Sequence, residues 1–374
     1  MKFIHLAPKR FEHVSADNIY IGNLAENFAK ILKDDYILVV GNKLPNQFAG
    51  LKTINLRLRT WGKSVWLYFW LPYLYIFFWI FYFLLAGRKE KDKIFFSSDH
   101  NSLAILIFFR SLFHFNYRIC SDWHMLYDNW KDGVVARQSD YLITTSQKLK
   151  RLLVDKSGVS SGKALVAYGG VNLDFFKTAP NGREKLGLPL DKKIVGYIGL
   201  FKTMGLEKGI GVMIAALPYL DENIVMAFVG AKESQIEEYE KMTKELGVLE
   251  RCLFKPVQSP QDAVFYEQAM DILTIPYPDE PHFRLYGFPM KVYEYMASRR
   301  PIIYSKLDLV EEVIGDCAVG FEADNAKDLA QKIVEVENNK ERYADLSDKA
   351  YNKVKEYSWQ KKAEQIMNFI NTTS

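Results

Sequence analysis

Short apolar runs rich in β-branched and aromatic residues alternate with longer amphipathic segments along the second half of the chain. Each run ends in Gly, Pro or polar residues and is followed by a helical pattern, as in parallel β/α proteins. The alternation therefore predicts a doubly wound parallel sheet, in which ligands bind beyond the carboxyl ends of the strands. The predicted strands are residues 193–199, 224–230, 252–257, 271–277 and 301–305.

The first half of the chain shows the same alternation less clearly. Its apolar runs are KFIHLA, YILVV, KTINLRL, KIFFSS, YRICSD, YLITTS and ALVAYGG. We therefore expect two Rossmann-like α/β domains, an N-terminal domain over residues 1–180 and a C-terminal domain over residues 181–357. The amphipathic terminal helix, residues 358–374, could pack back on the first domain.

Residues 65–86 break this pattern because they contain no charged residue. A helix of this length could cross a bilayer, yet the predicted strands before and after it belong to one sheet, and a single span would separate them. We expect instead a helix in the membrane interface, with basic flanks near anionic lipid. The alternative is a buried helix or a hydrophobic dimer contact. The basic flanks are Arg57, Arg59, Lys63, Arg88, Lys89, Lys91 and Lys93.

Positive charge is concentrated in the first half of the chain. Residues 1–180 contain 24 Lys and Arg against 14 Asp and Glu, although the net charge of the whole chain is only +4. A basic half favours an anionic partner, such as nucleic acid, a phosphorylated ligand or an anionic membrane, although unevenly charged solvated faces are the alternative. Three scattered cysteines and an N-terminus without a signal-peptide pattern predict a cytoplasmic protein.

Several familiar catalytic motifs are absent from the sequence. It has no GxxxxGK[ST] loop, no dinucleotide fingerprint, no GxSxG and no HExxH. It also has no Asp-x-Asp pair, the usual metal clamp for a sugar nucleotide. We therefore expect that the protein uses neither a metal nor another cofactor.

Two segments of the second half fit an anionic nucleotide ligand. In GYIGLFKTMGLEKGIG, Gly199, Lys202 and Lys208 can bring N–H and ammonium groups to phosphates, although a solvated loop is the commoner outcome. In GFPMKVYEYMA, Lys291 adds positive charge at the start of a helix. Glu294, which lies between two tyrosines, can accept two ribose hydroxyls, or it can be a structural residue bonded to the helix end.

Four segments, taken in order, resemble the family-4 glycosyltransferases of the GT-B fold. They are YGGVNLDFF, GYIGLFKTMGLEKGIGVMIAAL, YGFPMKVYEYMASRRPII and YSWQKKAEQI. The resemblance implies two Rossmann-like domains facing a cleft, and metal-independent transfer, with retention, from a UDP- or GDP-linked sugar. It assigns Lys208 to the diphosphate and Glu294 to the ribose.

The resemblance also implies further catalytic residues. The family carries an arginine where this chain has Leu200, and Lys202 is the candidate substitute. His124, in the segment SDWHMLYD, is a candidate contact to the sugar or the leaving group, although a lone histidine is often structural. The expected catalytic residues are therefore Lys208, Lys202 and His124.

One departure from the family affects the sugar pocket. Tyr286 stands where the family has its first glutamate, and three nearby residues could take over that role: Asp279, Glu280 or His282. Related segments with the pattern Pro-x-Lys-x-x-Glu-Tyr-Met-Ala often lack this glutamate, so activity is still expected. The expected donor-binding residues are Gly199, Tyr286, Gly287, Phe288, Met290, Lys291 and Glu294.

Together these features predict an enzyme that transfers a sugar from a nucleotide sugar to a lipid-linked or glycan acceptor at the inner face of a membrane. No nucleic-acid partner is expected. A nucleotide-sugar epimerase of the same fold is one alternative, and it would need acid/base carboxylates in the cleft. A non-catalytic, membrane-associated sugar-nucleotide binding protein is another, which the departures at Tyr286 and Leu200 keep open.

Overall fold

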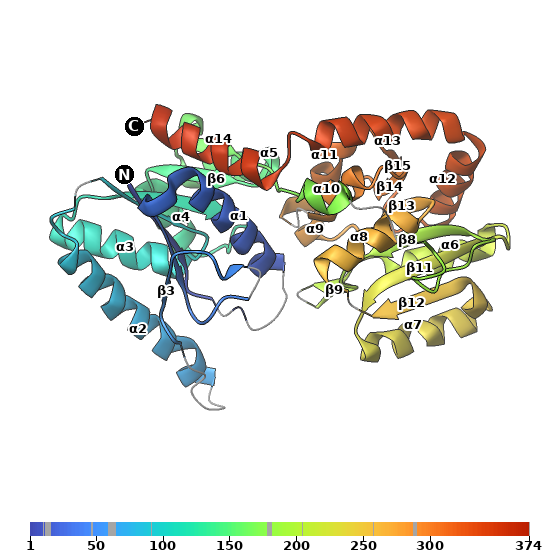
Figure 1. Cartoon of the computed structure of the whole chain (residues 1–374), viewed down its shortest axis with the longest axis horizontal. Coiled ribbons are helices and arrows are strands. Elements are labelled where there is room, and N and C mark those ends of the chain that lie inside the picture. The colour runs from blue at the N-terminus through green and yellow to red at the C-terminus, as the bar shows by residue number, and fades with distance from the viewer. Residues whose placement is uncertain are drawn as a thin grey trace. The chain divides into compact units, whose positions relative to one another are not determined.

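The computed structural model describes residues 1–9, 11, 16–45, 48–58, 65–90, 92–177, 182–203, 205–256, 258–286 and 290–373, with residues 65–70 described by their backbone alone. The chain divides into two compact units (Figure 1). Unit 1 consists of Met1–Tyr168 and Trp359–Ser374, and unit 2 is Gly169–Ser358. The division falls before the boundary expected at 180/181, and the terminal helix belongs to unit 1.

Unit 1 is built on a seven-stranded parallel sheet in the order β3-β2-β1-β4-β5-β6-β7. The strands are β1 (Lys2–Ala7), β2 (Tyr36–Val40), β3 (Thr53–Asn55), β4 (Lys93–Ser97), β5 (Arg118–Trp123), β6 (Tyr141–Thr144) and β7 (Ala164–Val166). The helices are α1 (Ala16–Leu32), α2 (Val65–Ala86), α3 (His100–Phe113), α4 (Trp130–Gln138), α5 (Gln147–Ser157) and α14 (Trp359–Thr372). Strands β1, β2 and β4 are buried almost throughout, as continuous apolar runs in a parallel sheet should be.

Unit 2 is built on a six-stranded parallel sheet in the order β12-β11-β8-β13-β14-β15. Its strands are β8 (Lys193–Ile198), β11 (Ile224–Ala231), β12 (Cys252–Pro256), β13 (Ile272–Ile275), β14 (Ile302–Ser305) and β15 (Val319–Phe321), with a separate hairpin of β9 (Lys202–Thr203) and β10 (Leu206–Glu207). The helices are α6 (Ile210–Ala216), α7 (Glu233–Glu245), α8 (Pro260–Ala269), α9 (Pro281–Leu285), α10 (Met290–Ala297), α11 (Asp308–Ile314), α12 (Ala326–Asn338) and α13 (Lys340–Val354).

The predicted fold class, two Rossmann-like parallel-sheet domains, is confirmed, with two differences in detail. The run KTINLRL contributes only the short edge strand β3, which is partly exposed. The sixth strand of unit 2, β15, was not among the expected strands because it is only three residues long. In each sheet the strand order reverses once, between β1 and β4 in unit 1 and between β8 and β13 in unit 2. Ligands of such sheets bind beyond the carboxyl ends of the strands at this reversal.

Helix α2 is apolar on every side, and over its residues 71–86, whose side chains the structure describes, one side is buried against unit 1 and the other is exposed. Ile76, Ile80 and Leu84, spaced four residues apart, are buried. The helix lies beside α3 along one side of the unit (Figure 1). As far as their residues are described, none of the helices is both long and apolar enough to cross a membrane.

Candidate functional site

Helix α10 places Glu294 between two tyrosines that point into unit 2. The Tyr293 hydroxyl accepts a hydrogen bond from the Gly169 backbone N–H at 3.0 Å, and the Tyr295 hydroxyl accepts one from the Ile198 N–H at 2.8 Å. Both tyrosines are fully buried, whereas the Glu294 side chain keeps 27% of its surface exposed. Because successive helical residues are about 100° apart, Glu294 faces outward between two anchoring tyrosines.

Glu294 is joined to a buried carboxylate through Lys291. The Lys291 ammonium lies 2.5 Å from the Glu294 carboxylate and 3.1 Å from the carboxylate of Glu267 on α8. Glu267 is fully buried. Burial therefore raises the pKa of Glu267 to about 8, with Lys291 opposing the rise and Glu294 adding to it. Although burial disfavours its charge, the two carboxylates raise the pKa of Lys291 overall.

Lys208 is held in a tight loop at the carboxyl end of β13. Its backbone N–H donates to the Phe201 carbonyl at 2.9 Å, and its ammonium lies 5.9 Å from the centre of the Tyr277 ring. Burial, followed by the charge of Lys291, lowers the pKa of Lys208 to about 8. In the described part of the chain no carboxylate forms an ion pair with this ammonium, so its charge is available to an anion.

The residue after Lys208 must be a glycine. Gly209 has a φ of +83°, and a Cβ at this position would lie 1.6 Å from the carbonyl oxygen of Pro276. The following N–H groups are already engaged, because Glu207 accepts hydrogen bonds from the N–H groups of Gly209 and Gly211. The loop therefore offers the Lys208 ammonium, and not these two N–H groups, to a ligand.

The other expected donor-site residues are distributed around α9 and the end of β8. Gly199 follows β8 with a φ of +154°, and a Cβ there would lie 3.4 Å from the Lys291 Cε. Tyr286 ends α9, where its N–H donates to the His282 carbonyl, and Met290 begins α10. Gly287 and Phe288 lie outside the described residues.

Lys202 has a partner on another helix. Its ammonium lies 2.7 Å from the carboxylate of Glu238 on α7, and the pair is partly exposed. Asp279, a suggested substitute for the missing glutamate, is paired with Arg284. His282, the other main substitute, lies close enough to Lys208 for that charge, after burial, to lower the pKa of His282.

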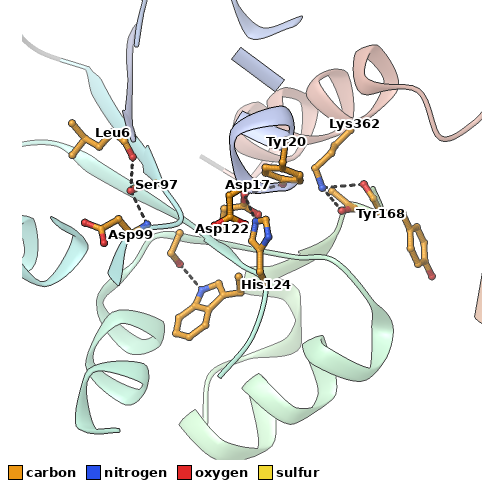
Figure 2. A network of polar contacts seen from close by, with 12 residues as sticks. Leu6, Asp17, Tyr20, Ser97, Asp99, Asp122, His124, Tyr168 and Lys362 are labelled. Atoms are coloured by element: carbon orange, nitrogen blue, oxygen red, sulfur yellow. Dashed lines mark hydrogen bonds and ion pairs between the residues drawn. The ribbon is translucent and has the colours of Figure 1, made fainter. Parts of the chain in front are cut away.

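His124 belongs to a polar network in unit 1. Figure 2 shows Tyr20, Asp122 and His124 pointing toward one another. The Tyr20 hydroxyl donates to Asp122 at 2.8 Å, and His124 Nε2 lies 3.1 Å from the same carboxylate oxygen. Although burial alone would raise the pKa of the fully buried Asp122, the charges of His124 and Lys362 and the Tyr20 hydroxyl lower it overall.

The terminal helix α14 contributes a second charge to this network. Lys362 is 2% exposed, and its ammonium donates to the backbone carbonyls of Ala167 and Tyr168 (Figure 2). The same ammonium lies 5.2 Å from the centre of the Tyr20 ring. Burial lowers the pKa of Lys362 to about 8, and Asp122 opposes the change. The helix that closes unit 1 is therefore fixed at the carboxyl end of β7, near His124.

Strand β4 ends beside the same network, at the strand reversal. The Ser97 hydroxyl donates to the Leu6 carbonyl at 2.6 Å and accepts from the Asp99 N–H at 3.0 Å (Figure 2). His124 therefore lies on the side of the unit 1 sheet where a ligand is expected. Among the described residues, no group of three or more His, Cys, Asp or Glu side chains could hold a metal ion.

Sequence reasoning missed Glu267, Asp122, Tyr20 and Lys362. The local sequence around these residues does not indicate a buried polar group, because each is buried by an element from elsewhere in the chain. A carboxylate in the predominantly apolar segment AVFYEQA of α8 was the one available signal for Glu267.

Comparison with known proteins gives one family and several structures of the same architecture. Residues 179–353 match the family of glycosyl transferases group 1. The D-inositol 3-phosphate glycosyltransferase of Corynebacterium aurimucosum is 23% identical over 245 residues, which are 62% of this chain and 56% of that protein. Alr3699/HepE of Anabaena, solved in complex with UDP, aligns over 100% of both chains with a TM-score of 0.77 and 15% identity. A glycosyltransferase from Rickettsia africae aligns over 100% of this chain and 98% of that one, with a TM-score of 0.78 and 15% identity.

The structural likeness shows that the chain has the GT-B fold. The chain spans about half the length of the curated relatives that it matches. The family match falls entirely within unit 2, which contains Lys208, Lys291 and Glu294.

We predict that Gly209→Ala destabilises unit 2 more than Gly205→Ala does. Both glycines have nearly the same φ, +83° and +82°, so the strain of a left-handed alanine, about 1–2 kcal/mol, is common to both. At Gly205 a Cβ meets nothing within 4 Å, whereas at Gly209 it collides with Pro276. Overpacking should cost roughly a further 1–3 kcal/mol. Urea unfolding of both variants measures the difference, and equal stabilities would contradict this account of the loop.

Proposed function

We propose that this chain, whose second unit matches the family of glycosyl transferases group 1, transfers a sugar from a UDP-linked donor to an acceptor hydroxyl, with retention and without a metal. One observation carries the proposal. At the strand reversal of unit 2, a half-buried ammonium without a carboxylate partner among the described residues, Lys208, lies beside the Lys291–Glu294 pair. A cation for phosphate and a carboxylate for sugar hydroxyls are the two groups that a nucleotide sugar needs.

The charges assign different parts of the donor to these residues. Lys291 is already balanced by Glu294 and Glu267, so Lys208 is the cation that stabilises the diphosphate leaving group. Glu294, exposed between its two tyrosines, accepts the ribose hydroxyls. UDP is the proposed nucleotide because Alr3699/HepE, which shares the fold, was solved with UDP. His124 is proposed to contact the sugar or the leaving group from unit 1, and Lys202 to assist Lys208 once released from Glu238.

The test of this function is incubation with a panel of UDP- and GDP-linked sugars, with and without a membrane extract, followed by measurement of free nucleotide and of labelled product. We expect release of UDP that depends on an acceptor, survives excess EDTA, and falls in Glu294→Ala. Release that is lost in EDTA and restored by Mg²⁺ would contradict the metal-free mechanism. Conversion of the donor sugar to its epimer would favour the epimerase, and binding without turnover would favour a binding protein.

The pKa of Lys208 predicts how UDP binding depends on pH. A lysine carries its charge below its pKa, so with a pKa of about 8 the ammonium is charged at pH 7 and largely neutral at pH 9. The UDP phosphates are fully ionised over this range, since a terminal phosphate titrates near pH 6. The Kd for UDP should therefore rise by about fivefold to tenfold between pH 7 and pH 9.

Calorimetric titration of Lys208→Met separates this effect from other titrating groups. The variant should bind UDP about tenfold more weakly at pH 7 and show a smaller rise in Kd toward pH 9. Lys241→Met, at a side chain that is 81% exposed on α7, is the control and should behave as the wild type. An unchanged pH profile in Lys208→Met would remove Lys208 from the phosphate site.

We also propose that unit 1 docks on an anionic membrane through α2 and α3, which would place the acceptor, a lipid-linked sugar or a glycan, at the cytoplasmic leaflet. The outer side of these two helices exposes large apolar residues: Leu74, Tyr75, Phe78, Tyr82, Leu85, Phe108, Leu112 and Phe113. Exposed Arg88 and Lys89 follow α2 and complement anionic lipid. Lys93, by contrast, is turned inward toward Gly87 and Glu90 and does not contribute.

Vesicle flotation tests this docking surface. The wild type should float with vesicles of phosphatidylcholine and phosphatidylglycerol, less strongly at high salt because exposed charges are screened. The variant Phe78→Ser/Tyr82→Ser should bind roughly a hundredfold more weakly, since each aromatic side chain contributes at least about 1.5 kcal/mol. These two residues are 60% and 72% exposed, whereas Phe77 and Phe81 pack on Phe109 and would disturb the fold.

The control for the vesicle experiment removes apolar residues from unit 2. Tyr219→Ser/Leu246→Ser changes side chains that are 59% and 41% exposed, so its loss of exposed apolar surface is comparable. It should float as the wild type does. Equal binding of all three proteins, or concentration-dependent dimerisation that is lost in Phe78→Ser/Tyr82→Ser, would contradict membrane docking.

A further inference from the structure

Glu267 is a charged residue for which the proposed function has no role. It lies on α8, is fully buried, and its Oε1 is 3.1 Å from the Lys291 ammonium. In the described part of the chain its Oε2 has no hydrogen-bond partner. A buried carboxylate without full compensation is costly, so a glutamate at this position calls for an explanation beyond packing.

The contact with Glu267 determines where Lys291 points. Lysine has a long, flexible side chain, and an i,i+3 pair such as Lys291–Glu294 on a helix surface is worth only about 0.2–0.5 kcal/mol. Here the Lys291 side chain is 22% exposed and is drawn toward α8 by the second carboxylate. Gly199 makes room for it, because a Cβ at that position would lie 3.4 Å from the Lys291 Cε.

The titratable groups around this contact come from several elements. Lys291, Glu294 and Tyr295 lie on α10, Tyr277 follows β13, and Lys208 precedes α6. Burial raises the pKa of Glu267, the Lys291 ammonium opposes the rise, and Glu294 adds to it. The ammonium faces both carboxyl groups, and of these only Glu294 is partly exposed.

We propose that Glu267 is a positioning residue of the donor site. It binds Lys291 from helix α8, and through Lys291 it fixes the Glu294 carboxylate in the orientation that receives the nucleoside hydroxyls. The inference rests on the proposed function and deepens it, because it assigns the nucleoside end of the donor to a chain of three residues from two helices. A fixed carboxylate loses less conformational entropy on binding than a mobile one. No contact joins Lys208 to Glu267 among the described residues, so a change at Glu267 should affect the phosphate end of the donor much less than the nucleoside end.

The test compares two substitutions of Glu267 by calorimetric titration with UDP and with inorganic pyrophosphate. Glu267→Gln keeps a side-chain oxygen acceptor for Lys291 at nearly the same volume, so its Kd for UDP should stay within about twofold of the wild type. Glu267→Met removes the acceptor at similar volume, and its Kd for UDP should rise about tenfold. Its Kd for pyrophosphate should stay within about twofold, because Lys208 is unaffected. Glu250→Met, on the exposed surface of the same unit, should change neither Kd.

A double-mutant cycle separates positioning from a merely structural role. If Glu267 acts through Glu294, then Glu267→Met/Glu294→Ala should bind UDP no more weakly than Glu294→Ala alone. Lys291→Met offers the same cycle if Glu267→Met does not fold. Three results would each overturn the inference. The first is a double variant whose loss of UDP affinity is the product of the two single losses. The others are wild-type UDP affinity in a folded Glu267→Met, and a loss of pyrophosphate affinity in that variant as large as its loss of UDP affinity. Failure of the wild type to bind UDP or any sugar nucleotide would instead overturn the proposed function.

Discussion

The ammonium of Lys291 lies between two carboxylates that come from different helices, and the local structure of the unit 2 site follows from that contact. Glu267 contacts the ammonium from α8, and Glu294 contacts it from α10. A lysine that is balanced in this way adds little positive charge for a ligand. Lys208, which has no carboxylate partner among the described residues, is therefore the proposed cation for phosphate. Burial, followed by the remaining repulsion from Lys291, lowers its pKa. This contact therefore lies between the proposed hydroxyl-binding end of the site and the proposed phosphate-binding end.

Backbone geometry keeps the two ends in place. Gly209 passes so close to the Pro276 carbonyl that no side chain fits, which fixes the Lys208 loop against the end of β13. Tyr293 and Tyr295 anchor α10 through backbone N–H groups at Gly169 and Ile198. Each of these contacts joins residues far apart in sequence, and those at Ile198 and Pro276 lie at the strand reversal of the sheet. They tie the candidate site to the sheet, and fixed groups are what a charge-stabilising site requires.

Most of the sheet in unit 2 could be predicted from sequence, because strands covered on both faces must be continuously apolar and their helices must be amphipathic. β8, β11 and β13 follow this rule, whereas the three-residue strand β15 is too short to show a pattern. The candidate site was predictable only as far as local signals reached. The glycine and lysine residues of the loop and Glu294 between tyrosines are such signals. The partners Glu267 and Glu238 were not predictable, since burial and pairing by a distant helix leave no trace near them in the sequence.

Helix α2 also shows a limit of prediction from sequence, in this case because its sequence is apolar throughout. A helix that is apolar on every side has no periodicity from which its buried face can be read. The structure resolves the ambiguity: Ile76, Ile80 and Leu84 face the unit, and Phe78 and Tyr82 face outward. The buried stripe explains why the helix packs on unit 1, whose strands precede and follow it in sequence. The outward residues have no such explanation within the described chain, and exposed apolar patches of this size often mark interaction surfaces, which supports the proposed docking. Aromatic residues with basic neighbours at one end suit a lipid headgroup region better than a protein partner, since both ring and charge find complementary groups there.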